Sequence, residues 1–258
     1  MRVFNYNTME KVKEFEAHSD FIRALAVHPK DPYLLTCSDD GSIILFDIDK
    51  GFSQVRVYEE HKNFVMRLAL NPKDLNMFAS ASMDSKIKIW SFTGSNSHLT
   101  LEGHTKGVSA LAFCPLNDKP YLASGSDDKL IKIWDYTNKH CIFTFDGHEE
   151  NISALCFHPE LPILISGAED STCKFWNVNT FRLEDSRLFG YETIWDICSQ
   201  STQNMIAFGC EEGTMVVRMG SDQPLAAFRY FYFNFNLVTH PRKLKLFMLN
   251  KMTFTLLI

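Results

Sequence analysis

The chain has 258 residues, of which 45% are hydrophobic and 22% are charged, with a formal net charge of −5. This balance predicts an ample buried core, and no apolar stretch reaches the roughly 18 residues that a membrane span needs. The first residues, which include Arg2, Glu10 and Lys11, lack the apolar region of a secretory signal. The seven cysteines are odd in number and form no C-x-x-C pair, so we expect reduced cytosolic thiols and no zinc site.

Two short strands are expected at the start of the chain, over residues 2–6 and 10–16. From residue 18 a pattern repeats four times with a period of 42 to 44 residues. A histidine is followed after 22 to 24 residues by an aspartate and then, six residues later, by a large aromatic; a Ser or Thr precedes the aspartate by four residues. The copies are His18, Thr36, Asp40, Phe46; His61, Ser80, Asp84, Trp90; His104, Ser124, Asp128, Trp134; and His148, Ser166, Asp170, Trp176.

This period, with Gly-His near one end and Trp-Asp at the other, resembles the WD repeat, in which each copy builds a four-stranded propeller blade. Gly103-His104, Gly147-His148 and Trp134-Asp135 match the repeat outright. The sequence therefore predicts an all-β fold, an incomplete WD-repeat β-propeller. Residues 1–16 are then the end of a truncated blade, and the blades occupy residues 17–228.

The repeated polar residues have a structural explanation. In blade geometry Asp, His, Ser or Thr, and Trp can form one chain of hydrogen bonds between outer and inner strands, each contributing about 1 kcal/mol. The same residue types form nucleophilic triads. A catalytic triad occurs once, whereas this set occurs in every blade, followed by an aromatic that would block it. We therefore expect neither an enzyme nor a cofactor or metal site.

Turn residues mark the ends of the predicted strands. Ser38-Asp39-Asp40-Gly41 is typical of a tight turn, in which glycine supplies a positive φ. His28-Pro29 and His158-Pro159 also end strands, because proline cannot donate to the sheet ladder. These two histidines are expected to be exposed and without chemistry.

A fifth repeat keeps the spacing but loses the polar residues. Gly190-Tyr191 replaces Gly-His, Glu212 replaces the aspartate, and Arg218 replaces the aromatic. This pattern predicts a degenerate fifth blade, with strands over residues 193–198, 205–209 and 214–219. The prediction for the whole fold is thus four full blades, one degenerate blade and one partial blade.

The last 30 residues, 229–258, form an atypical tail with five basic residues, five Phe, six Leu and no acidic residue. Two interpretations stay open. The alternation of Phe with Tyr and Asn over residues 230–238 could add a strand to an open sheet edge. Alternatively, the tail is not native coding sequence but translated intron or frame-shifted sequence. The second is favoured, because its residue types have AT-rich codons and the exposed segment would be prone to aggregation.

The loops of a propeller present a shared surface. Side chains two residues after each histidine and one before each aspartate are expected to point toward it. They are Asp20, Asp39, Asn63, Met83, Lys106, Asp127, Glu150 and Glu169. Five acids against one base would attract lysine- or arginine-rich peptides and not nucleic acid, although any one of them alone is an ordinary solvated charge. Phe64 is a candidate apolar contact on this rim, or a cover for the core.

Several segments outside the repeat consensus carry a closer resemblance. They are Arg2-Val3-Phe4-Asn5-Tyr6-Asn7-Thr8, Phe15-Glu16-Ala17-His18-Ser19-Asp20, Asn71-Pro72-Lys73-Asp74, Asp118-Lys119-Pro120-Tyr121-Leu122 and Phe157-His158-Pro159-Glu160-Leu161-Pro162-Ile163. Over residues 1 to about 224 the chain resembles the amino-terminal propeller of the coatomer beta-prime family. The resemblance implies a COPI coat subunit in Golgi-to-ER and intra-Golgi transport. It would be cytoplasmic, without a transmembrane segment, and peripheral on the Golgi membrane and COPI vesicles, with other coatomer subunits as partners.

The same resemblance implies a binding site. The family's first propeller grips the dilysine tails of membrane cargo, and Asp20 and Asp39 match the carboxylates that meet the lysines. Phe64 matches a rim aromatic of the family. The basic residues that clamp the cargo carboxylate lie in about two further blades that precede this start in the family, and a seventh blade, second propeller and helical solenoid are also missing. We therefore expect weak dilysine binding.

Two other functions stay open from the sequence. One is a generic WD-repeat scaffold for protein interactions within another complex, such as a ligase receptor. The other is a truncated, non-functional gene product.

Overall fold

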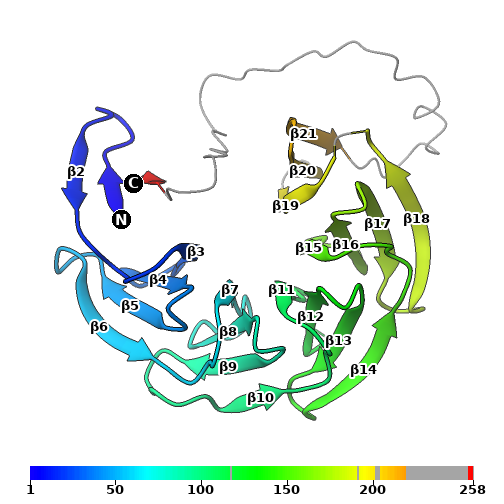
Figure 1. Ribbon diagram of the computed structural model, residues 1–258, viewed down its shortest axis with the longest axis horizontal. Coiled ribbons are helices and arrows are strands. Elements are labelled where there is room, and N and C mark those ends of the chain that lie inside the picture. Colours follow the sequence, from blue (N-terminus) through cyan, green and yellow to red (C-terminus); the bar gives the residue numbers. More distant parts are fainter. Residues whose placement is uncertain (117, 191, 201–203, 219–254, 258) are drawn as a thin grey trace.

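The predicted blades are separate sheets in the computed structural model, which describes residues 1–116, 118–190, 192–200, 204–218 and 255–257. Figure 1 shows the sheets arranged around a common centre as an open ring, with the amino-terminal strands at one end and the fifth repeat at the other. The described residues form strands and turns, which confirms the all-β, incomplete propeller. Among them, no helix is long and apolar enough to cross a membrane.

Each of the four intact repeats corresponds to one antiparallel sheet of four strands, and we number these blades one to four. Blade one consists of β3 (Ile22–Val27), β4 (Tyr33–Ser38), β5 (Ile43–Asp47) and β6 (Ser53–Tyr58). Blade two consists of β7 (Val65–Leu70), β8 (Met77–Ser82), β9 (Ile87–Ser91) and β10 (Leu99–Leu101). Blade three consists of β11 (Val108–Phe113), β12 (Tyr121–Ser126), β13 (Ile131–Asp135) and β14 (His140–Phe145). Blade four consists of β15 (Ile152–Phe157), β16 (Ile163–Ala168), β17 (Thr172–Asn177) and β18 (Arg182–Leu188).

The two ends of the ring are less complete. Blade five has three described strands, β19 (Ile194–Gln200), β20 (Met205–Cys210) and β21 (Gly213–Arg218). The partial blade pairs β1 (Arg2–Phe4) with β2 (Lys11–Glu14), and β22 (Thr255–Leu257) runs parallel to β1 on its other side. The strand predicted over residues 230–238 lies outside the described residues.

The hydrophobic core lies between the blades. Five buried clusters each join two neighbouring sheets in the described part of the chain. For example, the Tyr58 ring of blade one meets the Trp90 ring of blade two edge-on at 5.3 Å. The second strand of a blade is buried on both faces, as in β4, where every residue after Tyr33 is buried. This explains why such strands contain only apolar and small residues.

The innermost strand of each of blades one to five carries a β-bulge at its start. The pairing register shifts after the first residue of β3, β7, β11, β15 and β19. The extra residue is the second one in the strand, and in blades one to five it is Arg23, Met66, Ser109, Ser153 and Trp195. A bulge redirects its side chain out of the regular alternation. Blades three and four thus share a serine at this position, whereas blades one, two and five have arginine, methionine and tryptophan.

Candidate functional site

The repeated polar residues lie together as four hydrogen-bonded chains. Each repeat histidine contacts its aspartate through Nδ1 at 2.8–2.9 Å and its Ser or Thr hydroxyl through Nε2 at 2.7–2.8 Å. In repeats two to four the Trp Nε1 donates to the same serine oxygen at 2.7–2.8 Å. Phe46 takes the aromatic position in the first repeat and has no such donor. The histidine side chains are at most 1% exposed, which leaves them no access to a substrate.

The protonation states follow from this burial. Burial lowers the pKa of His18, His104 and His148, more strongly than their aspartates raise it, so these imidazoles are neutral at pH 7. For Asp84, burial alone would raise the pKa. Hydrogen bonds from His61 and the Lys62 backbone N–H outweigh this effect of burial and lower the pKa of Asp84 to about 2.

The prediction that His28 and His158 are exposed is wrong. They are only 7% and 1% exposed, because each ring folds inward over its own turn. His28 Nδ1 accepts from the Asp31 backbone N–H at 2.7 Å, and His158 Nδ1 accepts from the Leu161 N–H at 3.0 Å. The His28 Nε2–H donates to the Leu75 carbonyl of blade two at 3.1 Å, so this residue also joins two blades.

One end of the blades carries the predicted loop charges, and we call it the rim face. The residue one before each repeat aspartate occupies an equivalent place in all five blades, because its backbone N–H donates to the residue that precedes the inner strand at 2.9–3.0 Å. These residues are Asp39, Met83, Asp127, Glu169 and Glu211. The residues two before each inner strand are Asp20, Asn63, Lys106, Glu150 and Glu192. The rim face therefore has seven acids and one base at these ten positions.

Asp20 and Asp39, the two carboxylates implied by the resemblance, have different environments. Asp20 is exposed, and its Oδ1 accepts from the Phe21 N–H at 2.8 Å. Asp39 is 7% exposed, and both of its oxygens accept from the Arg23 guanidinium, with Nε at 2.6 Å from Oδ1. An incoming ammonium group would find Asp20 open to it and Asp39 already paired.

The weaker acidic candidates lie on blades three and four. Glu150 is exposed and 3.7 Å from the Lys129 ammonium, and Glu169 is exposed and accepts from the Asn151 amide at 3.2 Å. Within the described residues, no hydrogen bond or ion pair reaches the Asp127 carboxylate. Burial and the neighbouring Glu169 charge raise its pKa. Among the described residues, this part of the rim has more carboxylates than basic partners.

Phe64 is 42% exposed on the rim face, and two further aromatics accompany it. Phe21 precedes the inner strand of blade one as Phe64 does that of blade two, and it is 49% exposed. Trp195, at the bulge of blade five, is 42% exposed. Sequence reasoning missed Phe21 and Trp195, and with them Glu192 and Glu211. The 43-residue offset from Phe21 to Phe64 and the 42-residue offset from Glu169 to Glu211 could have identified two of them.

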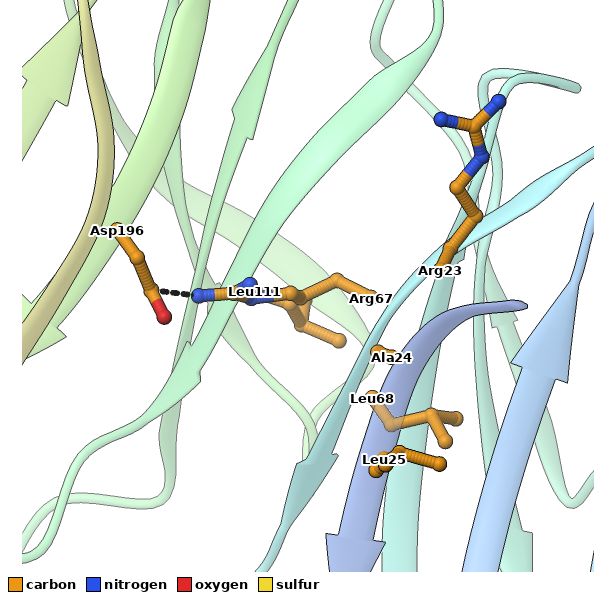
Figure 2. Close-up of a pocket in the computed structure, with 7 residues that line it drawn as sticks. All are labelled: Arg23, Ala24, Leu25, Arg67, Leu68, Leu111 and Asp196. Atoms are coloured by element: carbon orange, nitrogen blue, oxygen red, sulfur yellow. Dashed lines mark hydrogen bonds and ion pairs between the residues drawn. The ribbon is translucent and has the colours of Figure 1, made fainter. Parts of the chain in front are cut away.

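A cavity of about 370 Å³ occupies the channel between the inner strands. Figure 2 shows Arg67 of β7 reaching across it to Asp196 of β19, while the Arg23 guanidinium points away from this pair. Leu25, Leu68 and Leu111 complete its apolar wall. Both arginines already have carboxylate partners, so the cavity offers no unpaired charge.

Comparison with known proteins agrees with this architecture. The family described as WD domain, G-beta repeat, matches residues 9–47, 52–91, 95–135 and 139–177. Coatomer subunit beta' of Rattus norvegicus is 53% identical over 149 residues, which is 58% of this chain and 16% of the relative. The Drosophila melanogaster subunit is 50% identical over the same length. Probable coatomer subunit beta' of Schizosaccharomyces pombe is 44% identical over 213 residues, 83% of this chain and 21% of the relative. The matched part of the chain thus spans only 16–21% of the length of these relatives.

Proposed function

The chain belongs to the WD40-repeat family, and from its similarity to coatomer subunit beta' we propose that it acts in a COPI vesicle coat, where its propeller recognises dilysine tails of membrane cargo. The observation that carries the proposal is the ring of acidic side chains on the rim face. Seven acids at ten equivalent positions focus a negative potential at the channel mouth. Cationic peptides are the ligands that such a surface attracts, and nucleic acid is repelled.

Asp20 is the leading lysine contact in this proposal. Its carboxylate is exposed and accepts from one backbone N–H, which leaves acceptor capacity for an ammonium group. Asp39 contributes differently, since a lysine that approaches it must share it with Arg23. Phe64 supplies an exposed apolar surface on the neighbouring blade for the lysine methylene groups.

The proposed cellular role is that suggested by the coatomer subunit beta' relatives. In this proposal the protein is cytoplasmic, lies peripherally on Golgi membranes and COPI vesicles, and works with other coat subunits in retrograde and intra-Golgi transport. It binds its ligand without a chemical reaction.

Titration of the full chain with a fluorescent Lys-Lys-x-x tail peptide tests the proposal. Asp20→Asn removes one charge from an exposed position and should weaken binding by roughly fivefold or more, in line with a charge-assisted contact. Asp39→Lys should weaken it as well. Asp49→Asn is the matched control, since Asp49 is exposed at the opposite end of β5 from the rim face. Equal affinity for wild type, Asp20→Asn and Asp39→Lys would refute dilysine recognition and favour a generic interaction scaffold.

A further inference from the structure

Trp195 differs from the other tryptophans of the chain. All four lie within the described residues, and Trp90, Trp134 and Trp176 are at most 3% exposed, whereas Trp195 is 42% exposed. The three buried rings take part in the blade network. Trp195 occupies the bulge of β19, where the extra residue leaves the regular alternation of the strand. A large aromatic face at the mouth of the channel is therefore open to solvent.

The orientation of this indole is fixed. Its Nε1–H donates to Glu211 Oε2 at 2.5 Å, and Glu211 is the rim residue one before the repeat aspartate position. The second carboxylate oxygen, Oε1, accepts no hydrogen bond within the described residues, and no described cation pairs with Glu211 or with the exposed Glu192 beside the same strand. An aromatic face oriented by this hydrogen bond thus lies next to carboxylate charge that the described chain does not neutralise.

Blade one shows which group fits this arrangement. There the equivalent bulge residue is Arg23, and its guanidinium pairs with both oxygens of Asp39, the rim residue of the same blade. Both pairs are separated by 16 residues in the chain. In blade five the carboxylate holds an indole in place of an arginine. In blade one the rim carboxylate is paired with a guanidinium. The bulge residue of blade five supplies no guanidinium to its rim carboxylate.

We propose that Trp195 is a docking point for an arginine side chain of a basic peptide, which stacks on the indole face and pairs with the free oxygen of Glu211. Arginine fits better than lysine, because a planar guanidinium stacks on a ring and at the same time presents N–H groups to a carboxylate. The acidic rim supplies the charge complementarity. This proposal extends the proposed function, because it adds an arginine subsite on blade five to the lysine contact on blade one.

Three sets of peptides test the subsite on the full chain. The first carries an arginine two, four or six residues before a Lys-Lys-x-x end, the second has alanine in its place, and the third keeps the arginine but has both lysines replaced by alanine. With wild type, at least one arginine peptide should bind roughly three- to tenfold more tightly than its alanine counterpart, the range of a cation–π contact. Trp195→Leu should remove that gain and leave the alanine peptides unaffected.

Controls separate this subsite from the lysine site. Leu188→Ala alters another exposed apolar residue, which is 71% exposed at the end of β18. This variant should still bind the arginine peptide more tightly than the alanine peptide. Asp20→Asn should lower the affinity for every peptide that contains the two lysines, but the arginine peptide should still bind more tightly than its alanine counterpart. The proposal is overturned if no arginine peptide binds more tightly than its alanine counterpart, or if the tighter binding persists in Trp195→Leu. Neither outcome would affect dilysine recognition.

Fluorescence gives a readout on the wild-type protein alone. Because Trp195 is the exposed tryptophan, acrylamide quenching reports mainly on it, and the arginine peptides should protect it. If the lysine peptides fail to bind, the proposed function fails, and the third peptide set decides the subsite by itself. Protection by those arginine-only peptides supports the subsite, and unchanged quenching overturns it.

Discussion

Arg67 on β7 and Asp196 on β19 form an ion pair across the central channel, although 129 residues separate them in the chain. The pair links blades two and five, which are not neighbours in the ring (Figure 1). It therefore adds a direct connection to the contacts between adjacent blades.

This connection predicts a small, salt-dependent coupling. The two side chains are 27% and 50% exposed, so solvent screens the pair, and a double-mutant cycle with Arg67→Gln and Asp196→Asn should give about 0.5–1 kcal/mol. The coupling should shrink in 1 M salt. Urea unfolding measures it. A coupling of zero at low salt would show that the pair does not stabilise the ring.

Removal of one aspartate from the blade network should destabilise the protein much more. Asp128 accepts from the His104 ring at 2.8 Å and from the Thr105 N–H at 3.0 Å, and its side chain is 4% exposed. Asp128→Ala should lower the free energy of unfolding by about 1–3 kcal/mol, because buried partners lose their acceptor. Thermal unfolding checks this, with Asp49→Ala as the exposed control. Equal midpoints for the two variants would contradict the role of the network.

The first repeat offers an internal comparison for the tryptophan contact. Ser124 Oγ forms hydrogen bonds with both His104 and Trp134, whereas Thr36 Oγ1 forms one with His18 and has no indole donor beside it. Ser124→Ala should therefore cost about 1 kcal/mol more than Thr36→Val, the value of one additional buried hydrogen bond. Urea unfolding of both variants measures the difference. Equal costs would show that the indole contact adds nothing.

Repetition made the fold predictable from the sequence. Four copies of one spacing identify each strand position several times. A departure from the consensus, such as Phe46 in place of tryptophan, therefore does not obscure the pattern. The spacing also located Asp20, Asp39 and Phe64 on one face. It could not reveal that Arg23 covers Asp39, because that contact depends on a bulge and the pattern contains no signal for one.

The errors and omissions have a similar cause. Proline after His28 and His158 indicates the end of a strand, but turn composition does not determine whether the ring points inward. Trp195 was missed because nothing in the repeat pattern marks the bulge. Glu211 directly precedes Glu212, so the 42-residue offset reaches it even though the fifth repeat has lost its aspartate. The rim position of Glu211 is shown by its backbone hydrogen bond to Thr193, which blade five keeps although it has lost the repeat residues.

The buried histidines predict a loss of stability in mild acid. Burial lowers the pKa of His104 and His148 in the folded protein, so below about pH 6.5 the unfolded chain binds protons that the folded chain does not. Their stabilising contribution is complete above that pH and is lost as the pH falls. Asp84, with its pKa lowered to about 2, adds a further loss below about pH 4. Thermal midpoints should fall from pH 7.5 to 5.5, and His104→Gln should fall less. Equal wild-type midpoints at both values would contradict this prediction.

The turn after each repeat aspartate predicts a stabilising substitution. Gly41 takes this position with a φ of 81°, and Ser171 takes it in blade four with a φ of 63°. A side chain in this left-handed conformation costs about 1 kcal/mol, whereas the greater freedom of glycine in the unfolded chain costs roughly 0.5 kcal/mol. Ser171→Gly should therefore raise the free energy of unfolding by about 0.5 kcal/mol, and Gly41→Ala should lower it by about 0.5 kcal/mol or more. Urea unfolding measures both. Ser171→Ala, which keeps the Cβ atom, should leave stability unchanged, and a gain from that control equal to the gain from glycine would show that backbone strain is not the cause.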